Sequence, residues 1–390
     1  MINLKCNCKM GEHKAPVEEY VIEPGAIEKT ADYVKKYSKI YMVCDETTYE
    51  VAGKKVEKIL KDNNKLFSMI VLPKNPLPDY KTLGNILVHL TNPKNDSDIF
   101  DFSPLPDLIL AIGSGTINDS CRLVSYRFGI PYGIIGTAPS MDGYLSAGSP
   151  TLYDGTKNTI KCTTPRFLIA DTNIMKDAPW DMLLAGIGDM FGKYTGILDW
   201  ELARDYNNEY YCEKIANDVI DAANKCLENG YQLEKRSKEC IKNVIEGFVV
   251  TGLGMAFTGN SRPASGSEHI VAHAWELEDV ENGKKPNLHG LEVCEATRLV
   301  AEMYLILLKR TDDEHLKSLI LKYVDYFRAV EEFCVKMKVP SPVKDAERIK
   351  KSFTRALTMR DRYTILFYLN DRGLLEEYVE EALNNIIDRL

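Results

Sequence analysis

A chain of 390 residues exceeds the usual size of a single hydrophobic core, so we expect two domains. Its hydrophobic content of 45% and charged content of 27% are those of an ordinary globular protein. The 57 acidic residues outnumber the 49 basic ones and give a net charge of -8, which argues against nucleic acid as a partner.

The N-terminal sequence MINLKCNCKMGEHK lacks the apolar core and small-residue cleavage site of a signal peptide. The most apolar later stretch, GFVVTGLGMAF, is too short to cross a bilayer. Ten cysteines, mostly single, fit reduced thiols better than a disulfide framework, so we expect a cytoplasmic protein. Cys6-x-Cys8 with His13 close behind could form a small metal clip, but the spacing differs from the usual C-x2-C and favours an exposed N-terminal segment.

Residues 1–171 alternate apolar runs with amphipathic stretches. Apolar strands separated by helices are typical of a parallel sheet covered on both faces, so a Rossmann-like α/β domain is predicted here. Residues 93–107 are predicted to form a surface loop, and residues 152–166 a β-hairpin around a Tyr-Asp-Gly-Thr turn. The predicted strands are Ile40–Cys44, Phe67–Leu72, Leu108–Ile112, Tyr132–Ile135 and Phe167–Asp171, and the predicted helices include Thr48–Lys61 and Tyr80–Leu90.

The pattern changes after Asp171. Apolar residues then recur with the 3.6-residue period of amphipathic helices, and strand signals are almost absent. Residues 172–390 are therefore predicted to form an all-helical domain, with the boundary near Asp171. The predicted helices are Met182–Arg204, Glu213–Leu227, Lys235–Met255, Leu291–Lys309 and Glu376–Leu390.

Asp45 follows the first predicted strand and precedes a helix. A carboxylate in this position can accept hydrogen bonds from an adenosine ribose and would repel a 2′-phosphate, which favours NAD over NADP. The alternative, that Asp45 only caps the helix at Thr47 and beyond, fits the sequence equally well.

The third predicted strand runs directly into Gly113-Ser114-Gly115-Thr116 and then into a helix. Glycines let the backbone approach a pyrophosphate, and a helix N-terminus offers unpaired N–H groups and a partial positive charge. The turn is therefore a candidate phosphate cradle. Because the full G-x-G-x-x-G pattern is absent, an ordinary strand-to-helix turn is an equal alternative.

Residues 136–149, GTAPSMDGYLSAGS, follow the next predicted strand and are crowded with small and hydroxylated residues. Thr137, Ser140 and Ser146 supply hydroxyls and Asp142 a carboxylate at the carboxyl end of the predicted sheet, where ligands of α/β proteins bind. These four residues are candidate site residues.

Three of the six histidines, His269, His273 and His289, cluster in the second half of the chain. His269 and His273 share one helix face, and Asp189 and Lys193 have the same four-residue spacing on an earlier helix, so two helices could bring ligands to one point. Imidazole and carboxylate together suit a borderline divalent metal ion. A metal or catalytic site is favoured over three structural histidines.

A helix is predicted to begin near Gly266, because Ser265 and Glu268 form an S-x-x-E capping box. Arg262 precedes this box and could hold an anion beside the positive helix end. A surface arginine is an equal alternative for Arg262.

Taken together, these blocks resemble the sn-glycerol-1-phosphate dehydrogenases of the iron-type alcohol dehydrogenase and dehydroquinate synthase superfamily. The resemblance rests on strand–GSGT–helix, GTAPSMDGYLSAG, GIGDMFGKYT, SRPASGSEHxxxHAWE and LHG. The tail RDRYTILFYLNDRG and the chain length are most similar to the bacterial AraM-type members, and the resemblance extends from Glu19 to the C-terminus. It implies an NAD-binding α/β domain, a helical metal-binding domain and an active site in the cleft between them.

The resemblance also implies one divalent metal ion per chain, zinc or nickel, with Asp189, His269 and His289 as ligands and an open position for the substrate oxygen. It implies that His273 lies near the substrate, that Asp189 and His273 are catalytic, and that Asp142 contacts the substrate. Two departures are the serine at position 114, where relatives often carry glycine, and His289-Gly290-Leu291 in place of the family's HGE, whose glutamate is lost or replaced by Glu292. The implied NAD-site residues are Gly113, Ser114, Gly115, Thr116, Ile117, Thr137, Ala138, Pro139, Ser140 and Ser146.

We therefore expect reversible hydride transfer that interconverts dihydroxyacetone phosphate and sn-glycerol 1-phosphate, with the metal as Lewis acid. His273 would relay the proton and Arg262 would hold the phosphate. The alternatives are a glycerol or other polyol dehydrogenase, a lyase resembling dehydroquinate synthase, which has a glutamate in place of Asp189, and a non-catalytic metal-binding protein. Relatives are often dimers or larger, so a homodimer or larger homo-oligomer is expected.

Overall fold

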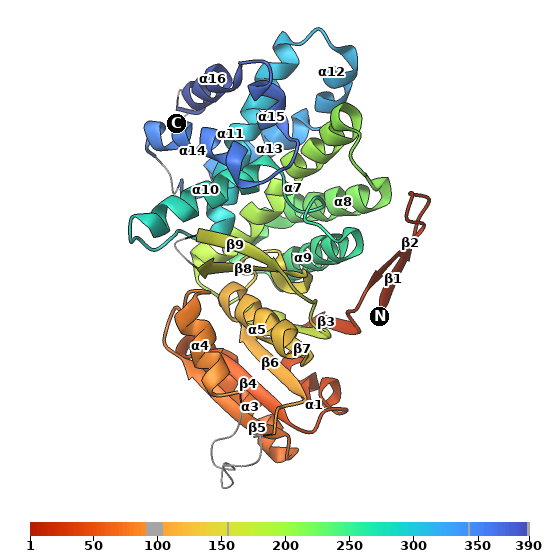
Figure 1. Ribbon diagram of the computed structural model, residues 1–390, viewed down its shortest axis with the longest axis vertical. Coiled ribbons are helices and arrows are strands. Elements are labelled where there is room, and N and C mark those ends of the chain that lie inside the picture. Colours follow the sequence, from red (N-terminus) through yellow and green to blue (C-terminus); the bar gives the residue numbers. More distant parts are fainter. Residues whose placement is uncertain (91–103, 154–155, 342–343, 388–390) are drawn as a thin grey trace. The chain divides into compact units, whose positions relative to one another are not determined.

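The computed structural model describes residues 1–90, 104–153, 156–341 and 344–387. The chain divides into two compact units, whose elements are labelled in Figure 1. Unit 1 comprises residues 1–4, 12–179 and 236–257, and unit 2 comprises residues 5–11, 180–235 and 258–390. Unit 1 contains a parallel sheet, and unit 2 is built mainly from helices.

Unit 1 is built on a six-stranded parallel sheet with the strand order β3-β10-β7-β6-β4-β5. Every residue of β4 (Ile40–Asp45) and β6 (Leu108–Gly113) is buried, as their apolar runs indicate for strands covered on both faces. The five predicted strands are confirmed, whereas the edge strand β3 was missed because its apolar run is short and bracketed by glutamates. The remaining strands of this sheet are β3 (Glu19–Glu23), β5 (Leu66–Leu72), β7 (Tyr132–Gly136) and β10 (Phe167–Asp171).

Helices cover both faces of this sheet. Alternate residues of β4 and β6 pack in one core cluster with residues 26–34 and with α3 (Lys54–Asp62). On the other face α4 (Tyr80–Val88) and α5 (Gly115–Phe128) pack beside each other, and the Tyr41 hydroxyl donates to the Ile86 carbonyl oxygen of α4 at 2.8 Å. The shorter elements are η1 (Ala26–Lys29), α1 (Thr30–Tyr33), α2 (Glu46–Thr48), η2 (Tyr49–Gly53) and α6 (Thr172–Met175).

The local predictions for the N-terminal half are largely confirmed. The predicted helix Thr48–Lys61 forms as consecutive helical segments, with the π-helical turn η2 between α2 and α3. β8 (Gly148–Tyr153) and β9 (Thr156–Lys161) form the predicted antiparallel hairpin, whose turn residues 154–155 lie outside the described residues. Most of the predicted loop 93–107 also lies outside them. β1 (Ile2–Lys5) and β2 (Glu12–Ala15) form a separate two-stranded sheet.

Unit 2 is organised around α7 (Trp180–Asn207), which is buried without interruption from Leu183 to Ala203. Helices α8 (Glu213–Asn229), α10 (Ser267–Glu281) and α11 (His289–Arg310) pack against α7. The predicted helices 182–204, 213–227 and 291–309 are confirmed, as is 376–390 up to the end of the described residues. The other elements of unit 2 are η5 (Gly230–Lys235), α12 (Glu314–Leu321), α13 (Val324–Lys336), α14 (Ala346–Met359), α15 (Ile365–Asn370) and α16 (Leu375–Ile387).

The predicted helix 235–255 forms as α9 (Lys238–Thr258), but it packs in unit 1. A Cβ atom on Gly252 would lie 2.9 Å from the Cβ of Leu145, so the α9 backbone closely approaches η4 (Gly143–Leu145). Unit 1 therefore extends to Pro179 and includes most of α9, whereas the sequence predicted a boundary near Asp171. The 3.6-residue period shows that a segment is helical but not which unit it packs in.

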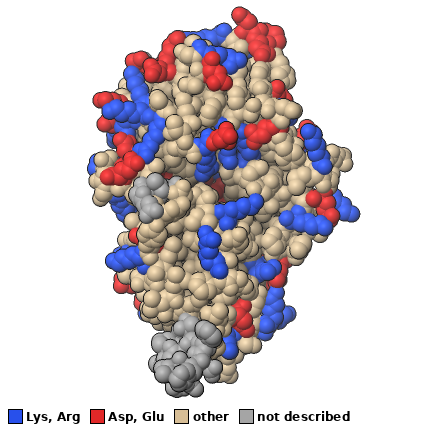
Figure 2. Space-filling model, in the orientation of Figure 1, with Lys and Arg blue, Asp and Glu red and all other residues tan. Residues whose placement is uncertain are grey.

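The hydropathy of the helices and the distribution of charged side chains on the surface were compared with what a membrane or a polyanion would require. Within the described part of the chain, α9 alone is long and apolar enough to cross a bilayer, although the stretch GFVVTGLGMAF inside it was predicted to be too short. Of its apolar window 61% is buried, as in the core helix of a globular protein. On the face shown in Figure 2, acidic and basic side chains are interspersed over the surface. The net negative charge is therefore not gathered into one broad patch on this face.

Candidate active site

The carboxyl ends of β4 and β6 form the topological switch point of the sheet. The chain leads from β4 to its neighbour β5 on one side, and from β6 through β7 to β10 on the other. Ligands of open α/β sheets bind in the crevice at such a point. Asp45 ends β4 and the Gly113-Ser114-Gly115 turn follows the adjacent β6, so the two segments predicted to bind a dinucleotide lie at neighbouring strand ends.

The turn after β6 requires glycine at its first position. A Cβ atom on Gly113 would lie 2.8 Å from the side chain of Ile117, which is closer than real Cβ contacts. Ser114 caps α5, and its Oγ accepts the Gly115 N–H at 2.7 Å and lies 2.9 Å from Ser140 Oγ. Thr116 is half-buried in the first turn of α5. The N-terminus of this 14-residue helix is suited to an anion.

Asp45 caps the short helix α2. Its Oδ1 accepts the Thr48 N–H at 2.8 Å, and Thr48 Oγ1 accepts the Asp45 N–H at 2.9 Å. The helix-cap alternative for Asp45 is therefore observed. Its contact with a ribose stays a prediction.

Arg122 of α5 holds the loop 136–149. Its side chain is fully buried, forms an ion pair with Asp119 at 2.5 Å, and donates to the carbonyl oxygens of Gly143 and Gly148, the latter at 2.6 Å. The sequence did not single out Arg122, because an arginine on a helix is usually a surface residue. This arginine fixes the backbone of the loop that carries the predicted hydroxyls.

The predicted residues of this loop are mostly enclosed. Thr137 N–H donates to the Gly113 carbonyl oxygen at 3.1 Å, so the start of the loop lies beside the glycine turn. Asp142 is 8% exposed and immediately precedes η4, and Ser146 Oγ donates to the Gly148 carbonyl oxygen at 3.2 Å. The structure thus brings the turn after β6 and the start of this loop together in unit 1. The other buried members of the predicted set are Ala138, Pro139 and Ser140.

In unit 2, small residues on α7 let two further helices approach its backbone. A Cβ atom on Gly188 would lie 2.6 Å from the Gly290 carbonyl oxygen at the start of α11. One on Gly196 would lie 3.3 Å from the nitrogen of Gly266, the residue before α10. Because residues four apart share a helix face, the segment GIGDMFGKYTG brings the N-terminal ends of α10 and α11 close to Asp189.

Asp189, His269 and His289 meet at these helix ends. Each offers one ligand atom, and the three atoms lie within 4.8 Å of one another. Asp189 and His269 are buried, and His289 is half-buried. His273 belongs to an overlapping group with Glu276 and His289, and its ring stacks on that of His289 with 5.1 Å between centroids. The structure therefore brings together the three predicted ligands, with His273 beside them.

Two buried glutamates orient the imidazoles. Glu276 Oε1 lies 2.7 Å from His289 Nδ1, and its Oε2 lies 2.9 Å from His273 Nδ1. Glu268 Oε1 lies 2.7 Å from His269 Nδ1. A carboxylate acceptor favours the proton on Nδ1 and leaves the Nε2 lone pair of the neutral ring available to a cation. The sequence predicted neither orienting role.

The donor set fits a bound cation. His269 Nε2 is buried without a hydrogen-bond partner among the described residues, and it lies 3.3 Å from Asp189 Oδ1. A lone pair on each atom at this separation is unfavourable unless a proton or metal ion lies between them. Burial acts to raise the pKa of Asp189, but the Lys193 ammonium, 2.9 Å away, and the His269 ring hold it well below its usual range. Asp189 is therefore ionised, as a metal-binding carboxylate must be.

The capping box predicted for α10 does not form. Gly266 is the N-cap residue and provides no side-chain cap, although α10 begins at Ser267 as expected. Glu268 Oε1 accepts the Gly266 N–H at 2.7 Å and also contacts His269 Nδ1, so one carboxylate oxygen satisfies an N–H at the start of α10 and orients this ring. The S-x-x-E pattern alone does not distinguish these roles.

Arg262 is buried in an ion pair. Its Nε donates to Glu209 Oε1 at 2.6 Å, and its Nη2 donates to Glu209 Oε2 and to the Tyr363 carbonyl oxygen. Arg262 Nη1 is buried and has no hydrogen-bond partner within the described ranges. The surface-arginine alternative is wrong, because the side chain is 2% exposed. The phosphate contact predicted for Arg262 is untested, and the ion pair with Glu209 disfavours it because Glu209 already neutralises the charge.

Two further arginines, Arg360 and Arg362, contact the segment that leads into α10. Arg362 donates to Ser261 Oγ and to the Ser265 carbonyl oxygen, each at 2.7 Å, and Arg360 lies 3.4 Å from Ser265 Oγ. Across the described residues, neither arginine forms an ion pair with a carboxylate. Burial and the charges of Arg360 and Arg262 lower the pKa of Arg362 to about 9, which marks a site with uncompensated positive charge. The sequence alone did not indicate them, because they lie in a tail remote from the histidines.

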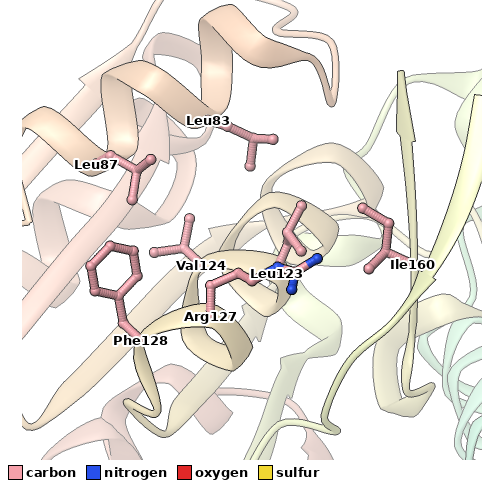
Figure 3. Close-up of a pocket in the computed structure, with 7 residues that line it drawn as sticks. All are labelled: Leu83, Leu87, Leu123, Val124, Arg127, Phe128 and Ile160. Atoms are coloured by element: carbon pink, nitrogen blue, oxygen red, sulfur yellow. The ribbon is translucent and has the colours of Figure 1, made fainter. Parts of the chain in front are cut away.

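A shallow apolar pocket lies elsewhere in unit 1. It is formed by α4 and α5, including Leu87 and Phe128, with Ile160 of β9 at one side (Figure 3). None of the predicted site residues lines it. This pocket therefore adds nothing to the candidate active site.

A parallel sheet with a glycine turn at its switch point, and a helical unit with an Asp-His-His donor set, are features of a metal-dependent dehydrogenase. The sequence matches the family model of iron-containing alcohol dehydrogenases over residues 21–179. Among solved structures, the iron-containing alcohol dehydrogenase of Thermococcus thioreducens matches with a TM-score of 0.71 at 14% identity, covering 95% of this chain and 99% of that one. The fold is therefore that of the iron-containing alcohol dehydrogenase class.

Full-length relatives narrow the assignment. A glycerol-1-phosphate dehydrogenase (NAD(P)+) of Bacillus licheniformis is 31% identical over 381 residues, covering 95% of this chain and 93% of that protein. A protein of the same name from Pyrococcus furiosus is 31% identical over 372 residues, covering 93% of this chain and 96% of that protein. The chain belongs to the glycerol-1-phosphate dehydrogenase family.

Proposed function

We propose that this protein is an NAD(H)- and metal-dependent dehydrogenase that interconverts dihydroxyacetone phosphate and sn-glycerol 1-phosphate. The observation that carries the proposal is the triangle of Asp189, His269 and His289, whose ligand atoms converge while His269 Nε2 has no hydrogen-bond partner among the described residues. The names of the full-length relatives support the substrate and the cofactor.

Asp189, His269 and His289 are proposed to hold one divalent ion, zinc or nickel. When bound, such an ion supplies Lewis-acid polarisation of the substrate carbonyl. The chain's own contribution is preorganisation. Glu268 and Glu276 fix the rings of His269 and His289, and Lys193 keeps Asp189 ionised.

His273 is proposed to exchange the proton of the substrate hydroxyl. Its Nδ1 is held by Glu276, so Nε2 is the nitrogen that can accept or deliver a proton. The Glu276 carboxylate stabilises the imidazolium that forms when Nε2 accepts a proton, as the acidic partner of a catalytic histidine does. Asp142 remains the proposed partner of a substrate hydroxyl.

Arg360 and Arg362 are proposed to bind the substrate phosphate, in place of the Arg262 expected from the sequence. Two guanidinium groups without carboxylate partners among the described residues can accept a dianion in bidentate geometry. Arg262 is paired with Glu209 and is better suited to hold the backbone. It donates to the carbonyl oxygen of Tyr363, which follows Arg362 in the sequence and precedes α15. In this proposal Arg262 is a positioning residue.

The dinucleotide is proposed to bind at the turn Gly113–Ile117 and the loop residues Thr137–Ser140, with Ser146 also contributing. The N–H groups at the start of α5 would bind the pyrophosphate. Asp45 would face the adenosine ribose, with the preference for NAD over NADP that its negative charge implies. A homodimer or larger homo-oligomer in the cytoplasm is the expected state of the enzyme.

The test is a comparison of substrates on the metal-loaded full chain. NADH oxidation should be fast with dihydroxyacetone phosphate, and NAD reduction should be fast with sn-glycerol 1-phosphate and slow with glycerol. A preference for glycerol would replace the substrate assignment by that of a polyol dehydrogenase, and absence of net NADH turnover would indicate a lyase or a non-catalytic metal protein. The His269→Ala variant should lose bound metal and turnover together, and retention of both would refute the proposed ligand set.

A further inference from the structure

A second group of soft ligands lies in unit 2, apart from the donor set just described. Cys6 and Cys8 occupy the turn between β1 and β2, and Cys212 is the N-cap residue of α8. Cys6 Sγ lies 2.9 Å from Cys8 Sγ and 3.8 Å from Cys212 Sγ, although Cys6 and Cys212 are 206 residues apart in the sequence. No disulfide joins these described cysteines. Three thiols from two distant segments thus converge on one point.

The backbone around Cys6 and Cys8 is closed into a tight turn. Cys6 N–H donates to the Gly11 carbonyl oxygen and Gly11 N–H donates to the Cys8 carbonyl oxygen, each at 3.0 Å. Gly11 has a φ of 68°, a conformation that glycine adopts without steric cost. The turn therefore presents both sulfurs to Cys212, and its backbone has little conformational freedom left to lose when a metal ion binds.

The sulfur geometry suits a tetrahedral ion. Zinc binds thiolates at about 2.3 Å, which places the sulfurs of a tetrahedral site about 3.8 Å apart. The separation of Cys6 and Cys212 is 3.8 Å, and that of Cys6 and Cys8 is shorter and must open by about 0.9 Å, a side-chain adjustment. The Tyr210 hydroxyl lies 3.2 Å from Cys8 Sγ, where it can donate to a thiolate.

We propose that Cys6, Cys8 and Cys212 form a structural zinc site that fastens the N-terminal turn to the start of α8. Soft thiolates select a borderline ion such as zinc over magnesium or calcium. A fourth position remains for water or an imidazole, and His13 follows in the sequence as C-x-C-x4-H. The site is independent of the proposed dehydrogenase activity, because none of its ligands belongs to the Asp189 group.

Metal content of the purified full-length protein tests the site. We expect two metal ions per chain in the wild type, and one in Cys8→Ser and in Cys212→Ser, which keep the turnover of the wild type. Cys226→Ser is the matched control, because Cys226 is a buried cysteine of α8 outside the cluster, and it should keep both ions. His269→Ala should lose the ion of the Asp189 group and keep the thiolate-bound ion. If the catalytic proposal failed, the wild type would bind one ion and each cysteine variant none, so the loss of one ion on substitution of a cysteine tests this site in either case.

Cobalt substitution tests the site in the wild type itself, so this measurement does not require that any variant folds. Cobalt bound to three thiolates should produce an intense ligand-to-metal charge-transfer absorption in the near ultraviolet. The band should persist in His269→Ala and disappear in Cys212→Ser. The proposal is overturned if wild-type protein shows no thiolate band, if Cys212→Ser retains two metal ions, or if protein purified anaerobically with zinc carries a Cys6–Cys8 disulfide by mass spectrometry.

Discussion

The Glu276→Gln substitution isolates the orientation of the two half-buried imidazoles. Glu276 accepts from His289 Nδ1 and from His273 Nδ1 through different oxygens, at 2.7 and 2.9 Å. A glutamine keeps one acceptor and turns the other atom into a donor, so one of the two rings must reverse its tautomer. For His289 the reversal removes the Nε2 lone pair that faces the proposed cation, and for His273 it removes the Nε2 lone pair that would accept the substrate proton. A hydrogen bond to a charged group contributes about 1.5–3 kcal/mol, equivalent to about 10–100-fold in a binding constant.

We therefore expect the metal dissociation constant of Glu276→Gln to rise about 10–100-fold, with the unfolding midpoint of the metal-free protein nearly unchanged. Chelator competition measures the first quantity, and urea unfolding with excess chelator measures the second. Glu281→Gln is the matched control, because Glu281 ends the same helix in an exposed ion pair with Arg355. Wild-type metal affinity and turnover in Glu276→Gln would refute the orienting role.

Three further predictions follow from unit 2. Arg362→Gln should lower kcat/KM for dihydroxyacetone phosphate about 10–100-fold while leaving the slow turnover of dihydroxyacetone unchanged, and an equal loss on both substrates would contradict the phosphate contact. Gly290→Ala places a Cβ inside contact distance of the Ala185 carbonyl oxygen, so the free energy of unfolding should fall by about 1–3 kcal/mol or more in urea titration. Burial and the nearby Glu268 charge raise the pKa of Asp199 to about 6, so the folded state holds this proton more tightly than the unfolded chain. The resulting stability is largely present at pH 4 and is lost as the pH rises through 6. The unfolding free energy of wild type minus that of Asp199→Asn should therefore fall by about 2 kcal/mol from pH 4 to 7, and a flat difference would exclude the shift.

The elements of the fold could be predicted because burial leaves a local pattern. β4 and β6 are covered on both faces and therefore consist of apolar residues apart from Asp45 at the end of β4. α9 was recognised as a helix by the same reasoning, but its unit was not, since its partner Leu145 is remote in the sequence. A periodic pattern records that a face is buried and not what buries it.

The cluster of three histidines and Asp189 could be predicted because its chemistry is rare, whereas the choice of Asp189, His269 and His289 as ligands came from the family resemblance. A histidine pair one helical turn apart has few roles. Asp189 lies in a segment of α7 whose glycines are explained by close packing against other helices. Glu276 could not be predicted, because a glutamate three residues after His273 is normally part of an exposed helix face. Cys212 could not be linked to Cys6 for a related reason, since residues this far apart in sequence leave no shared local pattern.

Charge balance connects the ligand set to the choice of substrate. Asp189, Glu268 and Glu276 carry three negative charges around the imidazoles, and Lys193 balances one of them, so a single divalent ion neutralises the remainder. Arg360 and Arg362 add two positive charges that form no ion pair with a carboxylate among the described residues, although the charge of Glu268 acts on both. A free polyol would leave both uncompensated in a partly buried site, whereas a phosphate dianion neutralises them. With Arg360 and Arg362 in the phosphate role proposed above, these charges favour a phosphorylated substrate over a free polyol.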